Sequence, residues 1–210
     1  NLGVQPHAIK LAKSVINSSL KIINKSKNLT KLLDKLKSDS KDAYEHGLYL
    51  SYMTTAICSN MNWKTHSTLE KISMASIFHD LSLPNELYQI ISQKDFDPSK
   101  LSNADRKIYD KHPAESSKTL ENDQHLPEGV SQIIQQHHEQ PDGSGFPKKL
   151  GALNISPMSA VFIIAEDFVH HMDGRSISKE IVAEIQEKFQ EKYNKGNFKK
   201  PLEGLLKTFE

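Results

Sequence analysis

Apolar residues recur along most of this chain three or four positions apart, which is the spacing of one face of an α-helix. Pro84 follows the second apolar stretch and is expected to prevent its continuation, and Pro113 is expected to break or bend a later helix. No segment alternates convincingly between apolar and polar residues, so we expect an all-α fold with essentially no sheet. Helices are predicted over residues 42–61, 69–78, 86–92, 104–120, 128–138, 157–172 and 178–193.

The first 40 residues differ in character from the rest. Residues 6–37 are rich in lysine and contain apolar positions that fit two further helices, but they hold no obvious chemistry. The pattern changes after Ser40. We therefore predict an N-terminal helical subdomain or connector at residues 1–40, used for packing or dimerisation, and a main domain at residues 41–210.

The amino-acid composition limits the kinds of partner and the cellular location that can be expected. The 210 residues include 27 Lys and Arg against 26 Asp and Glu, a formal net charge of +1. This balance gives no general reason to expect polymeric nucleic acid or an anionic membrane as a partner. No stretch approaches about 18 consecutive apolar residues, so no membrane span is predicted. Cys58 is the one cysteine, which excludes an internal disulfide and favours a reducing, cytoplasmic location.

Histidines and acidic residues form the candidate chemistry, and the chain has 10 histidines. His79 and Asp80 directly follow an apolar helix and offer a nitrogen and an oxygen donor from one short segment. His137 and His138 precede Glu139 at another helix end, where two adjacent imidazoles can both reach one metal ion. The glycines of the loop that follows permit tight backbone turns close to a ligand.

The string from His137 to Pro147 reads His-His-Glu-x-x-Asp-Gly-Ser-Gly-Phe-Pro and is long and specific. Together with the upstream His79-Asp80 pair, it resembles the HD-GYP family, a branch of the HD phosphohydrolase superfamily. That family has Gly-Tyr-Pro where this chain has Gly-Phe-Pro, with Phe146 in the middle. The resemblance implies an HD-superfamily multi-helix bundle over residues 41–210, with the first 40 residues outside it.

The resemblance also implies a set of metal ligands in which Asp80 bridges two ions. An ungapped alignment from Pro147 places the last ligand at Glu166, whereas Asp167 would require a one-residue slip. Imidazoles and carboxylates without a thiolate suit iron, or else manganese, better than structural zinc. Some family members hold a third ion with a Glu where this chain has Asp42, so a third ion stays open. With Asp80, one ion would have His46, His79 and Glu166, and the other His112, His137 and His138.

The five remaining histidines match nothing in the family pattern. His7, His66 and His125 are expected to lie at the surface. His170 and His171 lie just past the last implied ligand and are interpreted as incidental, although they could line the cleft.

The function implied by the resemblance is hydrolysis of cyclic di-GMP by a metal-dependent phosphodiesterase. Two close ions can hold a hydroxide at neutral pH and neutralise charge on a phosphate oxygen. Asp80 would be the central residue of the reaction, and Arg175 a forked donor to phosphate. The family is often fused to receiver or sensor domains, so signalling proteins that contact the loop at Phe146 are possible partners.

Two departures from the family pattern leave alternatives open. Ser82 and Leu83 stand where the HD motif usually continues with Gly-Lys, and leucine cannot donate to a phosphate oxygen. Phe146 lacks the hydroxyl of the family's tyrosine, for which a smaller effect is expected. We therefore expect a phosphodiesterase of weakened activity, with a metal-retaining nucleotide-sensing or protein-interaction module as the alternative. An HD phosphohydrolase for another nucleotide is a third hypothesis, which the string ending in Phe-Pro argues against.

Overall fold

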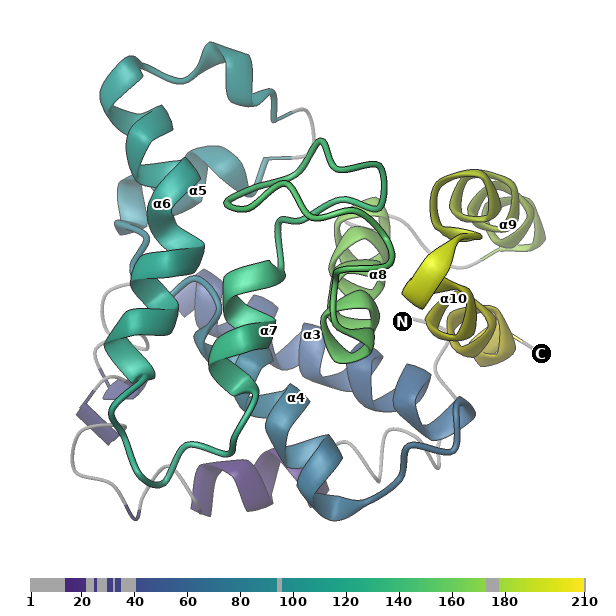
Figure 1. Cartoon of the computed structure of the whole chain (residues 1–210), viewed down its shortest axis with the longest axis horizontal. Helices are drawn as coiled ribbons and strands as arrows, with labels where there is room; N and C mark the ends of the chain where they lie inside the picture. The colour runs from purple at the N-terminus through teal and green to yellow at the C-terminus, as the bar shows by residue number, and fades with distance from the viewer. Residues whose placement is uncertain are drawn as a thin grey trace.

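The structure is a computed structural model that describes residues 14–21, 25, 30–31, 33–34, 41–93, 96–172 and 178–209. Within these ranges it is helical, with no strand and an isolated bridge between Asp142 and Gly151, so the predicted all-α class is confirmed. Figure 1 shows the helices packed around α4, α7 and α8. The helices are α3 (Lys41–Asn60), α4 (His66–Phe78), α5 (Asn85–Ile91), α6 (Asn103–Leu120), α7 (Val130–Gln136), α8 (Pro157–Met172), α9 (Lys179–Tyr193) and α10 (Lys199–Leu206), with 3-10 turns at Pro98–Lys100, Gly196–Phe198 and Lys207–Phe209.

The core lies where α4 is enclosed by α3, α7 and α8. Every residue of α4 from Ile72 to Phe78 is buried, because neighbouring helices cover several of its faces. A β-carbon on Gly47 of α3 would lie 2.6 Å from the backbone oxygen of Ser76 in α4. Only glycine therefore permits this close approach of the two helices. The consequence is that His46, next to Gly47, is brought to the end of α4.

Two elements differ from the sequence-based predictions. α6 continues through Pro113 to Leu120 as one helix, so the break that was expected as an alternative to a bend is absent. α10 was not predicted, since it is short and contains both Pro201 and Gly204. The proline lies in the first turn, where a helix tolerates it. The glycine packs against α3, where a β-carbon would lie 3.0 Å from the backbone oxygen of Ile57.

Part of the N-terminal segment contacts the main bundle. Residues 14–21 are helical, and Val15 is fully buried in the same apolar core as the other helices. Ser18 Oγ lies 2.8 Å from His66 Nε2 at the start of α4 and also bonds to Glu70. The division of the chain at residue 40 stays a prediction.

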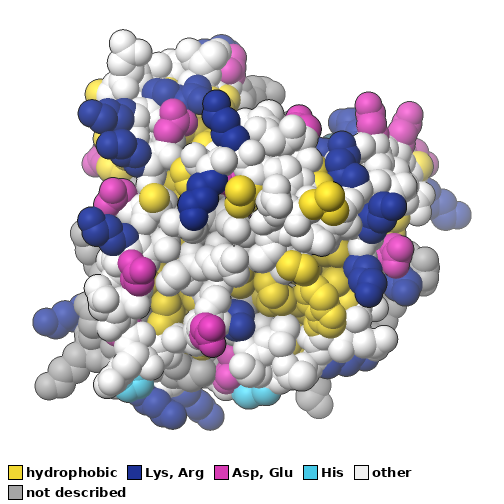
Figure 2. Space-filling model, viewed as in Figure 1, with side chains coloured by type: hydrophobic (Ala, Val, Ile, Leu, Met, Phe, Trp, Pro, Cys, Tyr) yellow, Lys and Arg dark blue, Asp and Glu magenta, His cyan; other side chains and the backbone are white. Residues whose placement is uncertain are grey.

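The described surface is mixed in charge. On the face drawn in Figure 2, basic and acidic side chains are interspersed and form no broad patch of one sign. No helix in the described ranges has both the length and the apolar character needed to cross a membrane.

Candidate metal centre

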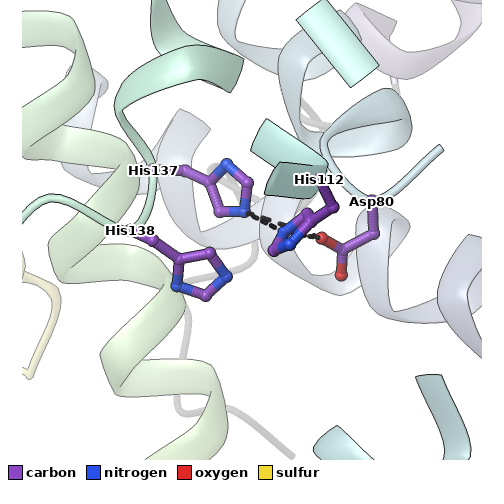
Figure 3. A group of neighbouring side chains, drawn as sticks. All are labelled: Asp80, His112, His137 and His138. Atoms are coloured by element: carbon purple, nitrogen blue, oxygen red, sulfur yellow. Dashed lines mark hydrogen bonds and ion pairs between the residues drawn. The ribbon is translucent and has the colours of Figure 1, made fainter. Parts of the chain in front are cut away.

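The seven side chains that the sequence singled out as metal ligands come together in the structure as two adjoining groups. Asp80 and His79 follow α4, His112 lies in α6, and His46 and Glu166 project from α3 and α8. Figure 3 shows the group formed by Asp80, His112, His137 and His138, in which Asp80 faces the imidazoles. Within each group, one donor atom per residue lies within 4.8 Å of all the others. The buried group is Asp80, His112, His137 and His138, and the rim group is His46, His79 and Glu166.

Three of the imidazoles are fixed by backbone carbonyls three residues earlier. The Nδ1 atoms of His79, His112 and His137 lie 2.9, 2.6 and 2.6 Å from these oxygens. His79 and His137 use carbonyls that are free because their helices end there. His112 uses the carbonyl of Tyr109, which is left free inside the helix because Pro113 has no N–H to bond to it. The Nδ1–H groups donate, and each Nε2 is left as an acceptor that faces the centre.

The Nε2 acceptors of these histidines face one another and the carboxylate oxygens of Asp80. His112 Nε2 lies 3.1 Å from His137 Nε2 and 3.1 Å from Asp80 Oδ1, and His79 Nε2 lies 3.2 Å from Asp80 Oδ2. His79 Nε2, Asp80 Oδ1 and Glu166 Oε2 are buried and have no hydrogen-bond partner among the described residues. Buried polar atoms without partners are costly, and lone pairs at these separations repel one another. A bound cation removes both penalties, so the donor set fits metal ions.

The electrostatics of the buried group favour neutral imidazoles around a charged carboxylate. Burial, together with the neighbouring His137 and His112, holds the pKa of His138 well below its usual value. Burial also lowers the pKa of His137. Burial disfavours the charged carboxylate of Asp80, but His79 and the other imidazoles outweigh it and hold the pKa of Asp80 well below its usual value. A charged Asp80 beside neutral His137 and His138 is a state in which these groups can bind a metal.

The rim group is centred on one oxygen of Glu166. Its Oε1 lies 3.2 Å from His46 Nε2 and 3.7 Å from His79 Nε2. It is also 3.1 Å from Nε2 of His170, which the sequence analysis interpreted as incidental. The signal for His170 was present in the sequence as a spacing of four from Glu166, which places both on one face of a helix.

Asp167, the alternative to Glu166 in the sequence alignment, points elsewhere. Its Oδ2 accepts a hydrogen bond from the hydroxyl of Tyr193 at 2.7 Å and lies 2.9 Å from Lys192 Nζ. Both partners belong to the end of α9. The structure therefore places Glu166 among the histidines and uses Asp167 to attach α9 to α8.

The loop that carries Phe146 covers the buried group. The ring of Phe146 stacks on that of His138, with centroids 4.7 Å apart and planes at 20°. This stacking contact does not need the hydroxyl of a tyrosine. The Phe146–Pro147 peptide bond is cis. A β-carbon on Gly145 would lie 2.4 Å from the carbonyl oxygen of His138, so this close return of the loop requires glycine.

Glu139 fixes the same loop, a role that the sequence analysis did not assign. Its side chain is fully buried, and it accepts hydrogen bonds at 2.7 Å from the backbone N–H groups of Lys148 and Leu150. Backbone donors to a carboxylate are strong hydrogen bonds. Glu139 therefore holds the end of the loop while the two residues before it, His137 and His138, face the metal centre.

The Ser82-Leu83 departure has two different structural consequences. The hydroxyl of Ser82 donates to the carbonyl oxygen of His112 at 3.1 Å, and the Ser82 N–H donates to Ser116 at 3.0 Å. Ser82 therefore attaches the end of α4 to α6. Leu83 is 8% exposed and lies in the hydrophobic core. Its side chain belongs to the packing of the bundle.

A cavity of 270 Å³ opens over the metal centre. Its wall includes three tyrosines and a lysine, so hydroxyl and ammonium donors line it beside the histidines. The residues of interest around it are His46, Asp80, Tyr88, Tyr109, His137, His138, Gln140, Glu166, His170, Lys192 and Tyr193.

Other predicted residues lie outside this arrangement. Arg175 and His7 fall outside the described residues. Asp42 accepts a hydrogen bond from Gln89 Nε2 at 2.7 Å and lies in a neighbouring hollow with His46, so it belongs to neither group of donors. His125 is partly exposed and lies 3.3 Å from Asp123.

Comparisons with known proteins agree with the helical architecture. The sequence model of the family described as HD domain matches residues 9–196. A solved structure, the HDG"Y"P protein Bd1817 from Bdellovibrio bacteriovorus, is similar with a TM-score of 0.62. The alignment has 17% sequence identity and covers 99% of this chain and 72% of that one, and at such identity it shows the fold alone. No curated protein sequence matches the chain.

Proposed function

The chain belongs to the HD-domain family, and from this premise we propose that it is a metal-dependent phosphodiesterase that hydrolyses cyclic di-GMP. The metal would be a pair of transition-metal ions, iron or manganese. The ligands would be the seven residues of the buried and rim groups, with Asp80 shared between them. The single observation that supports this most strongly is the convergence of unpaired acceptors on Asp80, directly below a cavity.

The two groups adjoin at Asp80. Its Oδ1 faces His112 of the buried group at 3.1 Å, while its Oδ2 faces His79 of the rim group at 3.2 Å. A carboxylate whose two oxygens face two sets of donors is suited to bridge two ions. Such a pair, when bound, supplies a hydroxide at neutral pH and offsets negative charge on a phosphodiester. The residues of the chain hold both positions, and burial lowers the pKa of His137 and of His138, which favours their neutral forms.

Protein donors around the cavity can orient a phosphodiester. Burial, with Asp80 and Glu166 nearby, raises the pKa of Tyr88 and of Tyr109 above the usual value for a phenol. Both phenols therefore stay protonated at neutral pH and can donate a hydrogen bond. Lys192 adds a cation to the same wall, held in place by Asp167.

A second hollow supports a substrate longer than one nucleotide. It has a volume of 360 Å³ and shares Gln140 and Lys192 with the cavity over the metal centre. Its wall also includes Lys188 and Lys195, together with the acidic side chains of Asp142 and Glu191. Ligand pockets for small molecules typically measure a few hundred Å³. A dinucleotide with one phosphate at the metals could place the second near these lysines.

The position of Leu83 favours a second candidate function. Since this side chain is packed in the core, the lysine that the HD-GYP pattern places there is replaced by an apolar contact. A site that holds metal and nucleotide but lacks that cation would turn over slowly. The chain would then act as a nucleotide-sensing or protein-interaction module.

Anaerobic purification, followed by metal analysis and chromatography of cyclic di-GMP with the same sample, distinguishes the two. We expect about two ions per chain and linear product. Intact substrate despite a full metal complement would reject the phosphodiesterase and favour the sensing module, provided that cyclic di-GMP binds. A chain that retains no iron or manganese would reject both. Asp110→Asn, an exposed acid on α6 that pairs with Arg106, is a control for nonspecific effects of removing an acid.

A further inference from the structure

His170 is one helical turn beyond Glu166 on α8. We propose that it is a positioning residue for Glu166: its Nε2–H donates to Glu166 Oε1 and fixes the orientation of the carboxylate toward the rim donors His46 and His79. This inference rests on the metal centre proposed above. The observed separation of His170 Nε2 and Glu166 Oε1 is 3.1 Å, which is the length of a hydrogen bond.

The two oxygens of Glu166 are in different surroundings. Oε1 is met by His46 at 3.2 Å and by His170 at 3.1 Å. Oε2 is buried and has no hydrogen-bond partner among the described residues. A glutamate side chain has three rotatable bonds, and holding one oxygen from outside limits where the other can point. Carboxylates that bind metals are commonly oriented by such outer hydrogen bonds.

His170 also closes the open side of the rim group. Its ring lies against that of His46, with centroids 5.1 Å apart and planes at 33°. Its side chain is 49% exposed, whereas that of Glu166 is 12% exposed. It lines both the cavity over the metal centre and the neighbouring hollow that contains Asp42. The imidazole therefore forms the wall that separates Glu166 from solvent on this side.

The next residue provides a matched control. His171 is on the same helix and has the same side chain, but it faces α9, where its Nε2 lies 3.4 Å from Glu184. Its ring packs against Phe189, with centroids 6.3 Å apart. Removing His171 changes helix packing without touching Glu166.

The test is a titration of the metal-free full chain with Co²⁺, followed by visible absorption, which reports the geometry around each ion. For His170→Ala we expect one of two binding events to weaken about 10- to 100-fold and its spectrum to change, while the other stays unchanged. His170→Gln should recover most of the affinity, since the amide nitrogen of glutamine can reach the position of the imidazole Nε2. His171→Ala should bind Co²⁺ like the unaltered chain.

Three results would overturn the inference in distinguishable ways. If His170→Ala leaves both affinities and both spectra unchanged, His170 does not position Glu166. If His170→Gln binds as weakly as His170→Ala, while both melt like the unaltered metal-free chain, the hydrogen bond is not the cause. If the unaltered chain binds no Co²⁺, the metal centre itself fails and this inference fails with it.

Discussion

The buried and rim groups use the same donor types but are built differently. In the buried group, His112 and His137 are 1% and 2% exposed, and backbone carbonyls fix their rings. In the rim group, the side chains of His46 and Glu166 are 14% and 12% exposed, and Glu166 is held by contacts with other side chains. Backbone carbonyls thus fix the rings of His112 and His137, and also that of His79 in the rim group, while the packing of α3 against α8 brings His46 and Glu166 together.

This difference suggests that the two halves hold metal with different strength. Backbone carbonyls cannot rotate away, so the imidazoles of His112 and His137 are preorganised and need little ordering when an ion binds. In the rim group His79 is fixed in the same way, but the side chains of His46 and Glu166 are nearer to solvent and lose more freedom on binding. We therefore expect the ion in the buried group to exchange more slowly than the ion in the rim group.

The largest effect is expected for Asp80→Ala, because Asp80 belongs to both halves. Both ions should be lost, and hydrolysis should fall by more than about a thousandfold, since the hydroxide and the charge compensation disappear together. Metal analysis and the chromatographic assay measure the two effects. Retained metal and activity would contradict the assigned centre, and Asp110→Ala, which changes an exposed acid, should behave like the unaltered chain.

His137→Ala and His46→Ala test the comparison directly. His137→Ala should remove the slowly exchanging ion, and its binding should weaken about a hundredfold or more. His46→Ala should weaken the other ion by a smaller factor, on the order of tenfold, because outer partners still hold Glu166. Mn²⁺ binding followed by electron paramagnetic resonance resolves the two. Equal losses of both ions in the two variants would show that the centre is one cooperative unit.

Leu83→Lys should lower stability. Leu83 is 8% exposed in the core, and its replacement exchanges apolar contacts for a charge that must reach solvent. We expect a loss of about 2 kcal/mol, which corresponds to about 4–8 °C in Tm for a chain of this size. Thermal melting measures it, with Leu83→Met as a control of similar volume. An unchanged Tm with faster turnover would indicate that the lysine reaches the metal centre from this position.

The smallest effect concerns Cys58, whose thiol is buried in α3 and is expected to react slowly. Burial raises its pKa to about 12, so almost no thiolate is present at pH 8. Iodoacetamide should therefore modify the folded chain at a negligible rate and the urea-unfolded chain readily. Because the thiol ionises more easily when unfolded, this group should weaken folding as the pH rises above about 9. Rapid modification of the folded chain would contradict this prediction.

The sequence determined the helices and the identity of the donors. The apolar spacing of α3, α4 and α8 is regular enough to predict each helix, because a buried helix face repeats every three or four residues. The motif around His79 and that around His137 indicated metal chemistry before any distance was known. These features are local, so a linear reading can find them.

The tertiary structure decided what depends on contacts between distant segments. α10 is short, contains Pro201 and Gly204, and gains its place by packing Gly204 against α3. The spacing of four places His170 on the same helix face as Glu166, but the sequence could not show the contact itself or that His171 meets α9, since both depend on how α8 packs. Leu83 likewise reads as a lost lysine in sequence but is an apolar core contact in space, because burial is a property of the whole bundle.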